Sequence, residues 1–400
     1  MGIFQPNVGC YEYFIEIMTK LIQWQEIKNS RVILRLDLNV PLKDNIIESD
    51  FRISKSLPVI NELLKRNNEL IILSHLGRPS VEKRESSLSL RVVCEHLSKM
   101  LDEPIKFITQ FTDNITFDNY RIIMLENMRF CKGEIDNDPE LARTISTYGD
   151  VFVFDAFGVS HRQESSTTGL MNFLDFAAGP LIESEVNAAR SILENPAKPL
   201  CTIISGAKIS TKISLIETFS DKADYLILGG GLLNTYLYCK GFELGDSLLE
   251  RDLQQDIVNF FESENAKKII MPIDLVCSAD ASLDNPKTKS ISMVQSNDRV
   301  LDIGTKSIER YAEIIKKSST VFWNGPLGYV EKKPYEKGTE SIINVLAESN
   351  CFSVVGGGDT VSIIESMGVE DKISYISTGG GALLKYIEGK DMSVIKKLRL

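Results

Sequence analysis

Short runs of apolar residues recur along the whole chain, and longer stretches with helix-like spacing of apolar positions separate them. Runs rich in β-branched and aromatic residues are typical of strands buried on both faces of a parallel sheet. In the first half these runs are VILRLDL from Val32, LIILS from Leu70, IIML from Ile122 and VFVF from Val151. In the second half they are LCTIIS from Leu200, YLILGGG from Tyr225, KIIMP from Lys268, VFWNG from Val321, FSVVGGG from Phe352 and ISYISTGGG from Ile373.

The segments between these runs predict crossover helices. Residues 52–66 and 252–264 have the apolar spacing and the length that such connections need. Between the two series of strands lies GPLIESEVNAARSILENPAKP, which begins after Ala178 and predicts a linking helix bounded by Gly179-Pro180 and Pro196. The pattern therefore predicts an α/β fold with two doubly wound parallel-sheet (Rossmann-like) lobes joined by one helix.

Composition narrows the class of protein. The 400 residues include 55 acidic and 45 basic side chains, a net charge of -10, which argues against a protein that coats nucleic acid. No apolar run approaches the roughly 20 residues of a membrane span. The seven cysteines are scattered without a CxxC pair, and the first residues do not resemble a secretory signal. We expect a cytoplasmic protein without a nucleic-acid or membrane partner.

The ends of the first four strands carry charged and polar side chains. Ligands of open α/β sheets bind beyond the carboxyl ends of the strands, so these positions are candidates for chemistry. They are Asp37, Asn39, His75, Arg78, Arg129, His161 and Arg162. Arginine binds carboxylates and phosphates through two parallel hydrogen bonds, so the set predicts a pocket for a small, multiply charged anion. A single arginine among them is more often a solvated charge or an ion-pair partner.

The strand ends of the second half are rich in glycine instead. The segments are Ser205–Lys208, Gly229–Gly231, Asn324–Gly328, Gly356–Thr360 and Ser377–Gly381. Glycine lets the backbone approach a phosphate, and a helix that begins there directs its free N–H groups at the anion. The pattern favours a polyphosphate site, although each glycine turn by itself often serves only tight packing of strand and helix.

Standard nucleotide motifs are missing from this half. The only Gly-Lys dipeptide, Gly389-Lys390, is followed by Asp391, so there is no P-loop, and no triplet completes GxGxxG. Lys208 and Lys212 lie four residues apart, which predicts one helix face with Lys212 one turn into the helix. Asp359 is a candidate ligand for a Mg²⁺ that bridges nucleotide phosphates. Solvated charge is the ordinary alternative for the lysine pair.

The motifs RLDLNVP, SHLGRP, LENMRF, DAFGVSHR, SGAKISTKI, GGG, WNGPLGYVE, GGGDT and STGGGA, in this order, resemble the phosphoglycerate kinase family. The resemblance runs from about Arg31 to Lys390. It implies a monomeric glycolytic enzyme that transfers a phosphoryl group in line and reversibly between 1,3-bisphosphoglycerate and MgADP, giving 3-phosphoglycerate and MgATP on domain closure. It also implies a phosphoglycerate-binding lobe (1–179), an interdomain hinge helix (180–198), a nucleotide-binding lobe (199–384) and a C-terminal segment (385–400) that returns towards the first lobe.

The resemblance also implies roles for individual residues. Those for phosphoglycerate are Asp37, Leu38, Asn39, Arg52, His75, Leu76, Gly77, Arg78, Arg129 and Arg162. Those for the nucleotide are Lys208, Lys212, Gly229, Gly230, Gly231, Gly304, Asn324, Pro326, Glu331, Gly357, Gly358, Asp359 and Thr360, with Asp359 also the Mg²⁺ ligand. The catalytic set is Arg52, Lys208, Lys212, Gly358 and Gly381; Arg52 is the arginine that spans donor and acceptor, and Gly380 adds a backbone N–H group.

The chain departs from the family pattern at several positions. Ser205 stands where a second glycine is usual, Thr305 where proline is usual, and Lys385 where an acidic residue is usual. Tyr375 replaces the histidine expected to face the acidic hinge residue, here Glu185. Residues 1–17 precede the usual family start, and Met18 is an alternative initiator.

Two other functions stay open at this point. A non-catalytic relative would keep the fold as a binding protein, although every charged motif position is filled. An ADP-forming acyl-phosphate kinase for another acid would use a similar set of arginine and histidine side chains.

Overall fold

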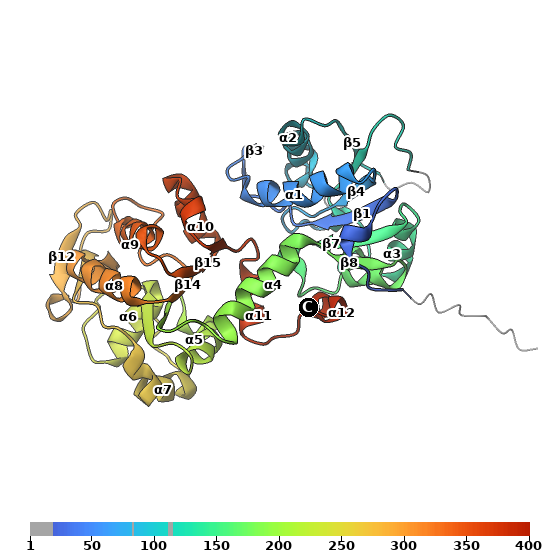
Figure 1. Cartoon of the computed structure of the whole chain (residues 1–400). Helices are drawn as coiled ribbons and strands as arrows, with labels where there is room; N and C mark the ends of the chain where they lie inside the picture. The colour runs from blue at the N-terminus through green and yellow to red at the C-terminus, as the bar shows by residue number, and fades with distance from the viewer. Residues whose placement is uncertain (1–18, 82–83, 111–114) are drawn as a thin grey trace, which may run out of the picture. The chain divides into compact units, whose positions relative to one another are not determined.

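The computed structural model describes residues 19–81, 84–110 and 115–400 (Figure 1). The prediction of an extension before residue 18, with Met18 as an alternative start, lies outside the described residues. By their packing, the described residues fall into two units. The first unit comprises the described residues among 19–36, 60–154 and 163–178, and the second comprises 37–59, 155–162 and 179–400. The predicted domain boundaries at 179, 198 and 384 stay a prediction.

The first sheet has six strands in the order β5-β6-β4-β1-β7-β8. The strands are β1 (Arg31–Leu36), β4 (Glu69–Leu73), β5 (Ile105–Ile108), β6 (Ile122–Leu125), β7 (Val151–Asp155) and β8 (Phe176–Ala178). Every residue of β6 and β7 is buried, as expected for strands covered on both faces. Helices α2 (Arg91–Leu101) and α3 (Pro139–Ser146) belong to the first unit. Helix α1 (Phe51–Lys65) is divided between the two units after residue 59, and β2 (Leu42–Lys43) and β3 (Ile46–Ile47) form a small hairpin of the second unit.

The second parallel sheet has five strands in the order β10-β9-β14-β15-β16. The strands are β9 (Leu200–Gly206), β10 (Tyr225–Gly229), β14 (Thr320–Asn324), β15 (Phe352–Gly356) and β16 (Tyr375–Ile376). Its helices are α5 (Ile213–Ser220), α6 (Gly230–Cys239), α7 (Gln255–Glu262), α8 (Thr305–Lys317), α9 (Lys337–Glu348), α10 (Gly358–Met367) and α11 (Gly381–Ile387). The rings of Phe219 and Phe322 stack 4.8 Å apart and join α5 to the buried strand β14.

Helix α4 (Pro180–Leu193) follows β8 and precedes the second sheet in the chain, and Figure 1 traces it as one uninterrupted helix. Pro180 occupies its first turn, where the missing N–H costs nothing, and a carboxylate oxygen of Asp155 accepts from the N–H of Ile182 (3.0 Å). A short helix, α12 (Ser393–Leu398), ends the chain. The α/β class with two parallel-sheet units is confirmed.

One predicted strand is wrong and another is short. The KIIMP segment forms only an isolated bridge, Leu226 to Ile269, after a 3-10 helix, η8 (Glu264–Lys268). Pro272 has no N–H to donate to a neighbouring strand, which is consistent with the absence of a strand here. The residues that follow form an antiparallel sheet that the sequence pattern did not predict. Its order is β12-β11-β13, with β11 (Asp274–Ser278), β12 (Lys287–Ser290) and β13 (Arg299–Ile303). ISYISTGGG contributes only the two residues of β16.

Among the residues that the structure describes, no helix has both the length and the apolar character that crossing a membrane requires.

Candidate functional site

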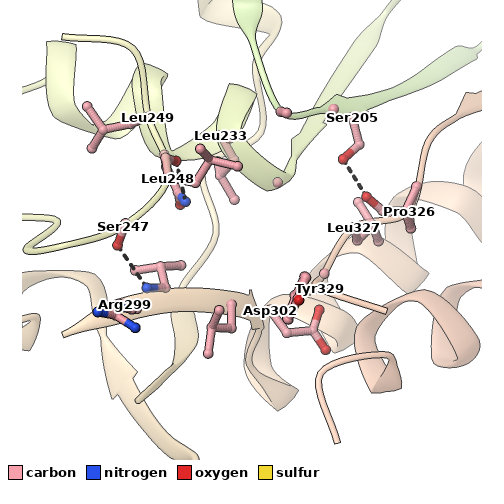
Figure 2. Close-up of a pocket in the computed structure, with 18 of the residues that line it drawn as sticks. Ser205, Leu233, Ser247, Leu248, Leu249, Arg299, Asp302, Pro326, Leu327 and Tyr329 are labelled. Atoms are coloured by element: carbon pink, nitrogen blue, oxygen red, sulfur yellow. Dashed lines mark hydrogen bonds between the residues drawn. The ribbon is translucent and has the colours of Figure 1, made fainter. Parts of the chain in front are cut away.

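A cavity of about 680 Å³ opens in the second unit beside the ends of its strands. Figure 2 shows Leu233, Leu248 and Leu249 near one end of it and Pro326, Leu327 and Tyr329 near the other, with Arg299 and Asp302 contributed by β13. Five of the predicted nucleotide residues line it, namely Gly230, Gly231, Pro326, Glu331 and Asp359. An apolar cleft with a few polar groups is the usual form of a small-molecule site.

The glycines after β10 are needed for close packing of the cavity wall. A Cβ on Gly231 would lie 2.1 Å from the carbonyl oxygen of Ala207, and one on Gly229 would lie 2.7 Å from the hydroxyl of Ser205. The Ser205 hydroxyl donates to the carbonyl of Pro326, drawn as a dashed line in Figure 2. The unusual Ser205 therefore ties the end of β9 to the loop after β14.

Lys208 and Lys212 do not lie on one helix face, so that part of the prediction is wrong. Lys208 has extended backbone angles and precedes a single 3-10 turn, η7 (Ile209–Thr211), and Lys212 is the residue before α5. Lys208 is exposed, whereas Lys212 is half-buried and donates from Nζ to Oδ1 of Asn324. Burial lowers the pKa of Lys212. An anion at this point would compensate for the lost hydration of the ammonium group.

The N-terminus of α10 faces the same region. Asn324, at the end of β14, donates from Nδ2 to the carbonyl of Gly356 (2.9 Å), and Gly357 follows with a positive φ of 107°. Apart from its chain neighbours and the nearby backbone of its own helix, no described atom lies within 4 Å of the place where a Cβ of Gly358 would stand. The Thr360 hydroxyl is buried and has no hydrogen-bond partner among the described residues. Free N–H groups and a spare hydroxyl at the start of a helix are suited to a phosphate.

Gly304 is placed differently from the other predicted nucleotide residues. It precedes α8, its N–H donates to the carbonyl of Asp274 (2.9 Å), and a Cβ would lie 2.3 Å from the carboxyl carbon of Asp274. It does not line the cavity, whereas its neighbours Asp302 and Ile303 do. Burial raises the pKa of Asp302 to about 7, while the N–H groups of Gly338 and Ile303 lower it. Arg299, Leu301 and Tyr329 also line the cavity and were not predicted, because the antiparallel sheet that positions β13 was not.

A second group of predicted residues in this unit is centred on Arg52. Its guanidinium donates to the carbonyl oxygens of Asn39 (2.6 Å) and Thr378 (3.0 Å) and lies 3.7 Å from the Asp37 carboxylate. Leu38, which lies between Asp37 and Asn39 in the sequence, is fully buried. Arg162 is half-buried three residues after the end of a 3-10 turn, η4 (Phe157–Val159). Gly380 precedes α11 and Gly381 begins it, and a Cβ on either would meet open space. The contacts show that Arg52 is held in place before any ligand binds.

Tyr375 makes no hydrogen bond with Glu185 among the described residues, although the histidine that it replaces is expected to face that carboxylate. The buried Glu185 carboxylate accepts from the Ser377 hydroxyl (2.7 Å) and from both the N–H and the hydroxyl of Thr378 (2.7 and 2.8 Å). These three donors occupy the carboxylate, and the Tyr375 hydroxyl is buried without a hydrogen-bond partner among the described residues. Burial raises the pKa of Glu185 to about 7.

The first unit holds the remaining predicted residues around two strand ends. His75 and Leu76 are buried after β4, Gly77 adopts a positive φ of 62°, and Arg78 is exposed. Arg129, in a 3-10 turn after β6, is only 3% exposed; it donates to the carbonyl of Gly77 and lies 3.6 Å from the Glu164 carboxylate. The structure therefore brings His75, Gly77 and Arg129 to adjacent strand ends of one sheet, where parallel pairing of β4 with β6 puts them.

Comparison with known proteins finds a matching family and similar solved structures. The sequence profile described as Phosphoglycerate kinase matches residues 22–390. A phosphoglycerate kinase structure from Coxiella burnetii is similar with a TM-score of 0.83 and 38% identity, covering 95% of this chain and 99% of that one. The crystal structure of phosphoglycerate kinase from Pyrococcus horikoshii OT3 is similar with a TM-score of 0.80 and 27% identity, covering 96% of this chain and 98% of that one.

Proposed function

The chain belongs to the phosphoglycerate kinase family of glycolytic phosphotransferases, and from that premise we propose the reaction and the residues that perform it. The phosphoryl group passes reversibly and in line between 1,3-bisphosphoglycerate and ADP, giving 3-phosphoglycerate and ATP. One observation supports nucleotide binding most directly. Lys212 contacts Asn324, and Asn324 contacts the backbone just before α10, beside a cavity large enough for a nucleotide.

The nucleotide is proposed to lie in the cavity of Figure 2 with its base among the leucine side chains and its phosphates towards α10. Glu331, which is exposed at the cavity edge, is placed to accept from ribose hydroxyls. The N–H groups of Gly357, Gly358 and Thr360 and the two lysines would meet the phosphates. Asp359 is exposed in the first turn of α10 and lines the cavity, so its carboxylate is suited to the Mg²⁺ that travels with the nucleotide.

Phosphoglycerate is proposed to bind to the residues to which the resemblance assigns it, namely Asp37, Leu38, Asn39, Arg52, His75, Leu76, Gly77, Arg78, Arg129 and Arg162. The arginine side chains match the charge and the planar shape of carboxylate and phosphate. Buried Arg129 is already ordered by Gly77, so little side-chain entropy is lost when an anion arrives.

The chemical step requires positioning and positive charge more than proton transfer. Phosphoryl transfer passes through a loose transition state with charge on the equatorial oxygens, which Lys212, Arg52 and the N–H groups of Gly358 and Gly381 would stabilise. Both the attacking oxygen of ADP and the leaving carboxylate are anionic, so no general base is needed. Closure of the two units would keep water away from the acyl phosphate. We propose that the enzyme acts as a cytoplasmic monomer.

One coupled assay tests the proposal against its two alternatives. Purified protein with MgATP is offered 3-phosphoglycerate, acetate and other small carboxylic acids, and ADP release is measured. Activity with 3-phosphoglycerate alone is expected. Activity with another acid in its place would indicate a different acyl-phosphate kinase, and binding of nucleotide without turnover of any acid would indicate a non-catalytic relative.

A further inference from the structure

Arg35 is the largest fully buried charged side chain of the first unit, and none of the roles above uses it. It lies in β1, two residues before Asp37, and its exposed fraction is 0%. A buried guanidinium that lacks partners is strongly destabilising, so its surroundings show what holds it there.

The Arg35 guanidinium makes three contacts, one from each nitrogen. Nη1 donates to the carbonyl of Leu36 (2.6 Å) and Nε donates to the Ser166 hydroxyl (3.1 Å). Nη2 lies 3.4 Å from Nδ1 of His75. The Leu36 carbonyl also accepts from the hydroxyl of Ser74, which precedes His75 (3.0 Å). Arg35 therefore joins the end of β1 to the end of β4, where His75 lies.

A buried carboxylate balances this charge. Glu134 is fully buried; Ser166 donates to it from both its hydroxyl and its N–H, the latter at 3.0 Å. Burial raises the pKa of Glu134, while the Arg35 charge and the Ser166 hydroxyl oppose this rise. The Ser166 hydroxyl thus accepts from Arg35 and donates to Glu134, which fixes the rotation of the guanidinium plane behind His75.

A guanidinium only donates hydrogen bonds, so Nδ1 of His75 must accept, and the ring proton is then on Nε2. We propose that Arg35, held by Ser166 and Glu134, is a positioning residue that fixes His75 as the neutral Nε2–H tautomer, ready to donate to an anionic oxygen of the substrate. The inference rests on the proposed function only in assigning phosphoglycerate to His75.

The test is the Arg35→Lys variant, which keeps a positive charge near Glu134 but cannot make three separate contacts with one ammonium group. The chain has three histidines, so ring ¹⁵N signals measured by NMR on the whole protein are few, and a His75→Gln variant assigns those of His75. The native spectrum is expected to show an unprotonated Nδ1 and a protonated Nε2. In Arg35→Lys this preference is expected to weaken, and the KM for 3-phosphoglycerate to rise about tenfold with the KM for MgATP unchanged.

Arg121→Lys is the matched control, because Arg121 also donates to a backbone carbonyl, that of Leu64, in the same unit. It is expected to leave the His75 signals and both KM values unchanged. If Arg35→Lys does not fold, the double variant Arg35→Met/Glu134→Met removes both buried charges together and serves the same test.

Unchanged ¹⁵N signals of His75 in a folded Arg35 variant would overturn the inference, whatever happens to the KM. A changed tautomer with an unchanged KM for 3-phosphoglycerate would also overturn the positioning role. The His75→Gln variant separates this failure from that of the proposed function: if it too leaves the KM unchanged, the assignment of phosphoglycerate to His75 is what fails.

Discussion

The two units differ in how they present part of their candidate ligand groups. In the first unit two of the candidate groups are buried side chains: Arg129 is 3% exposed and His75 is 4% exposed, and both contact groups of the same unit, whereas Arg78 is exposed. In the second unit Asn324 and Thr360 are buried and Lys212 is half-buried, but other nucleotide groups are open. Lys208 and Asp359 are exposed, and apart from its chain neighbours and the nearby backbone of its own helix no described atom lies within 4 Å of a Cβ built on Gly358.

This difference suits the two proposed ligands. A small anion with fixed geometry is best met by side chains that are already ordered and dehydrated, because their entropy and desolvation costs fall on folding instead of binding. A flexible polyphosphate can be met by backbone N–H groups, which need no side-chain order, and by exposed charges that adjust to it. We therefore expect the two units to respond differently to the same kind of substitution.

The largest effect is expected where charge meets the transferred group. Lys212→Ala and Arg52→Ala are each predicted to lower kcat by about 100-fold or more, because positive charge at the transition state is lost. Steady-state kinetics measure this, with circular dichroism to verify folding. Lys317→Ala, an exposed lysine at the end of α8, is the control and should retain kcat. Near-native kcat in either folded variant would remove that residue from the catalytic set.

Exchanging arginine and lysine at one buried and one exposed position tests the difference between the two units directly. Arg129→Lys is predicted to raise the KM for 3-phosphoglycerate by about tenfold to a hundredfold, because a lysine cannot both reach Gly77 and present a planar fork. Lys208→Arg is predicted to change the KM for MgATP by less than about threefold, because exposed Lys208 acts through its charge. Equal sensitivity of the two positions would contradict the distinction between ordered and open sites.

The sequence predicted most strands from the apolar pattern and many site residues from the polar groups at strand ends. Nine of the ten predicted strands are present, because a short apolar run such as Ile122–Leu125 buries its side chains most readily as a strand inside a sheet. The other features of the structure depend on contacts that the apolar pattern does not show. One example is the pairing of β11 with β12 and β13, and without it Arg299 and Tyr329 could not be assigned to the cavity. Arg35 lies inside the apolar run of β1, so the pattern predicts only a buried strand there, although a charge at such a position is itself a signal.

Substitution of two glycines of the second unit tests whether each is needed for packing or for nucleotide binding. A Cβ at Gly231 would lie 2.1 Å from a backbone oxygen, so Gly231→Ala is predicted to lower the free energy of unfolding by about 1–3 kcal/mol. Gly358→Ala meets open space and should keep its melting temperature, while the KM for MgATP rises severalfold because the methyl group keeps phosphate from the backbone. Thermal unfolding and kinetics on both variants decide this. A stable Gly231→Ala protein with impaired nucleotide binding would mean that this glycine acts on the ligand directly.

The smallest expected effect concerns the buried acidic group beside Tyr375. The Glu185 carboxylate holds the N–H and hydroxyl of Thr378, and the carbonyl of Thr378 accepts from Arg52. Burial raises the pKa of Glu185 to about 7, so its protonation near neutral pH would loosen the segment that orients Arg52. We therefore predict an inflection in kcat near pH 7 in the native enzyme, with the higher rate on the alkaline side.

Substitution at Tyr375 tests whether this inflection belongs to Glu185. Its hydroxyl has no hydrogen-bond partner among the described residues, so Tyr375→Phe should leave the pH profile of kcat unchanged. Tyr375→His puts an imidazole, whose ordinary pKa is about 6.5, where the charges of Glu185 and Asp155 act. The imidazolium favours the ionised carboxylate, so the inflection should move down by about one pH unit. Superimposable profiles for the native, Phe and His enzymes would show that Tyr375 only packs and that the inflection, if present, has another source.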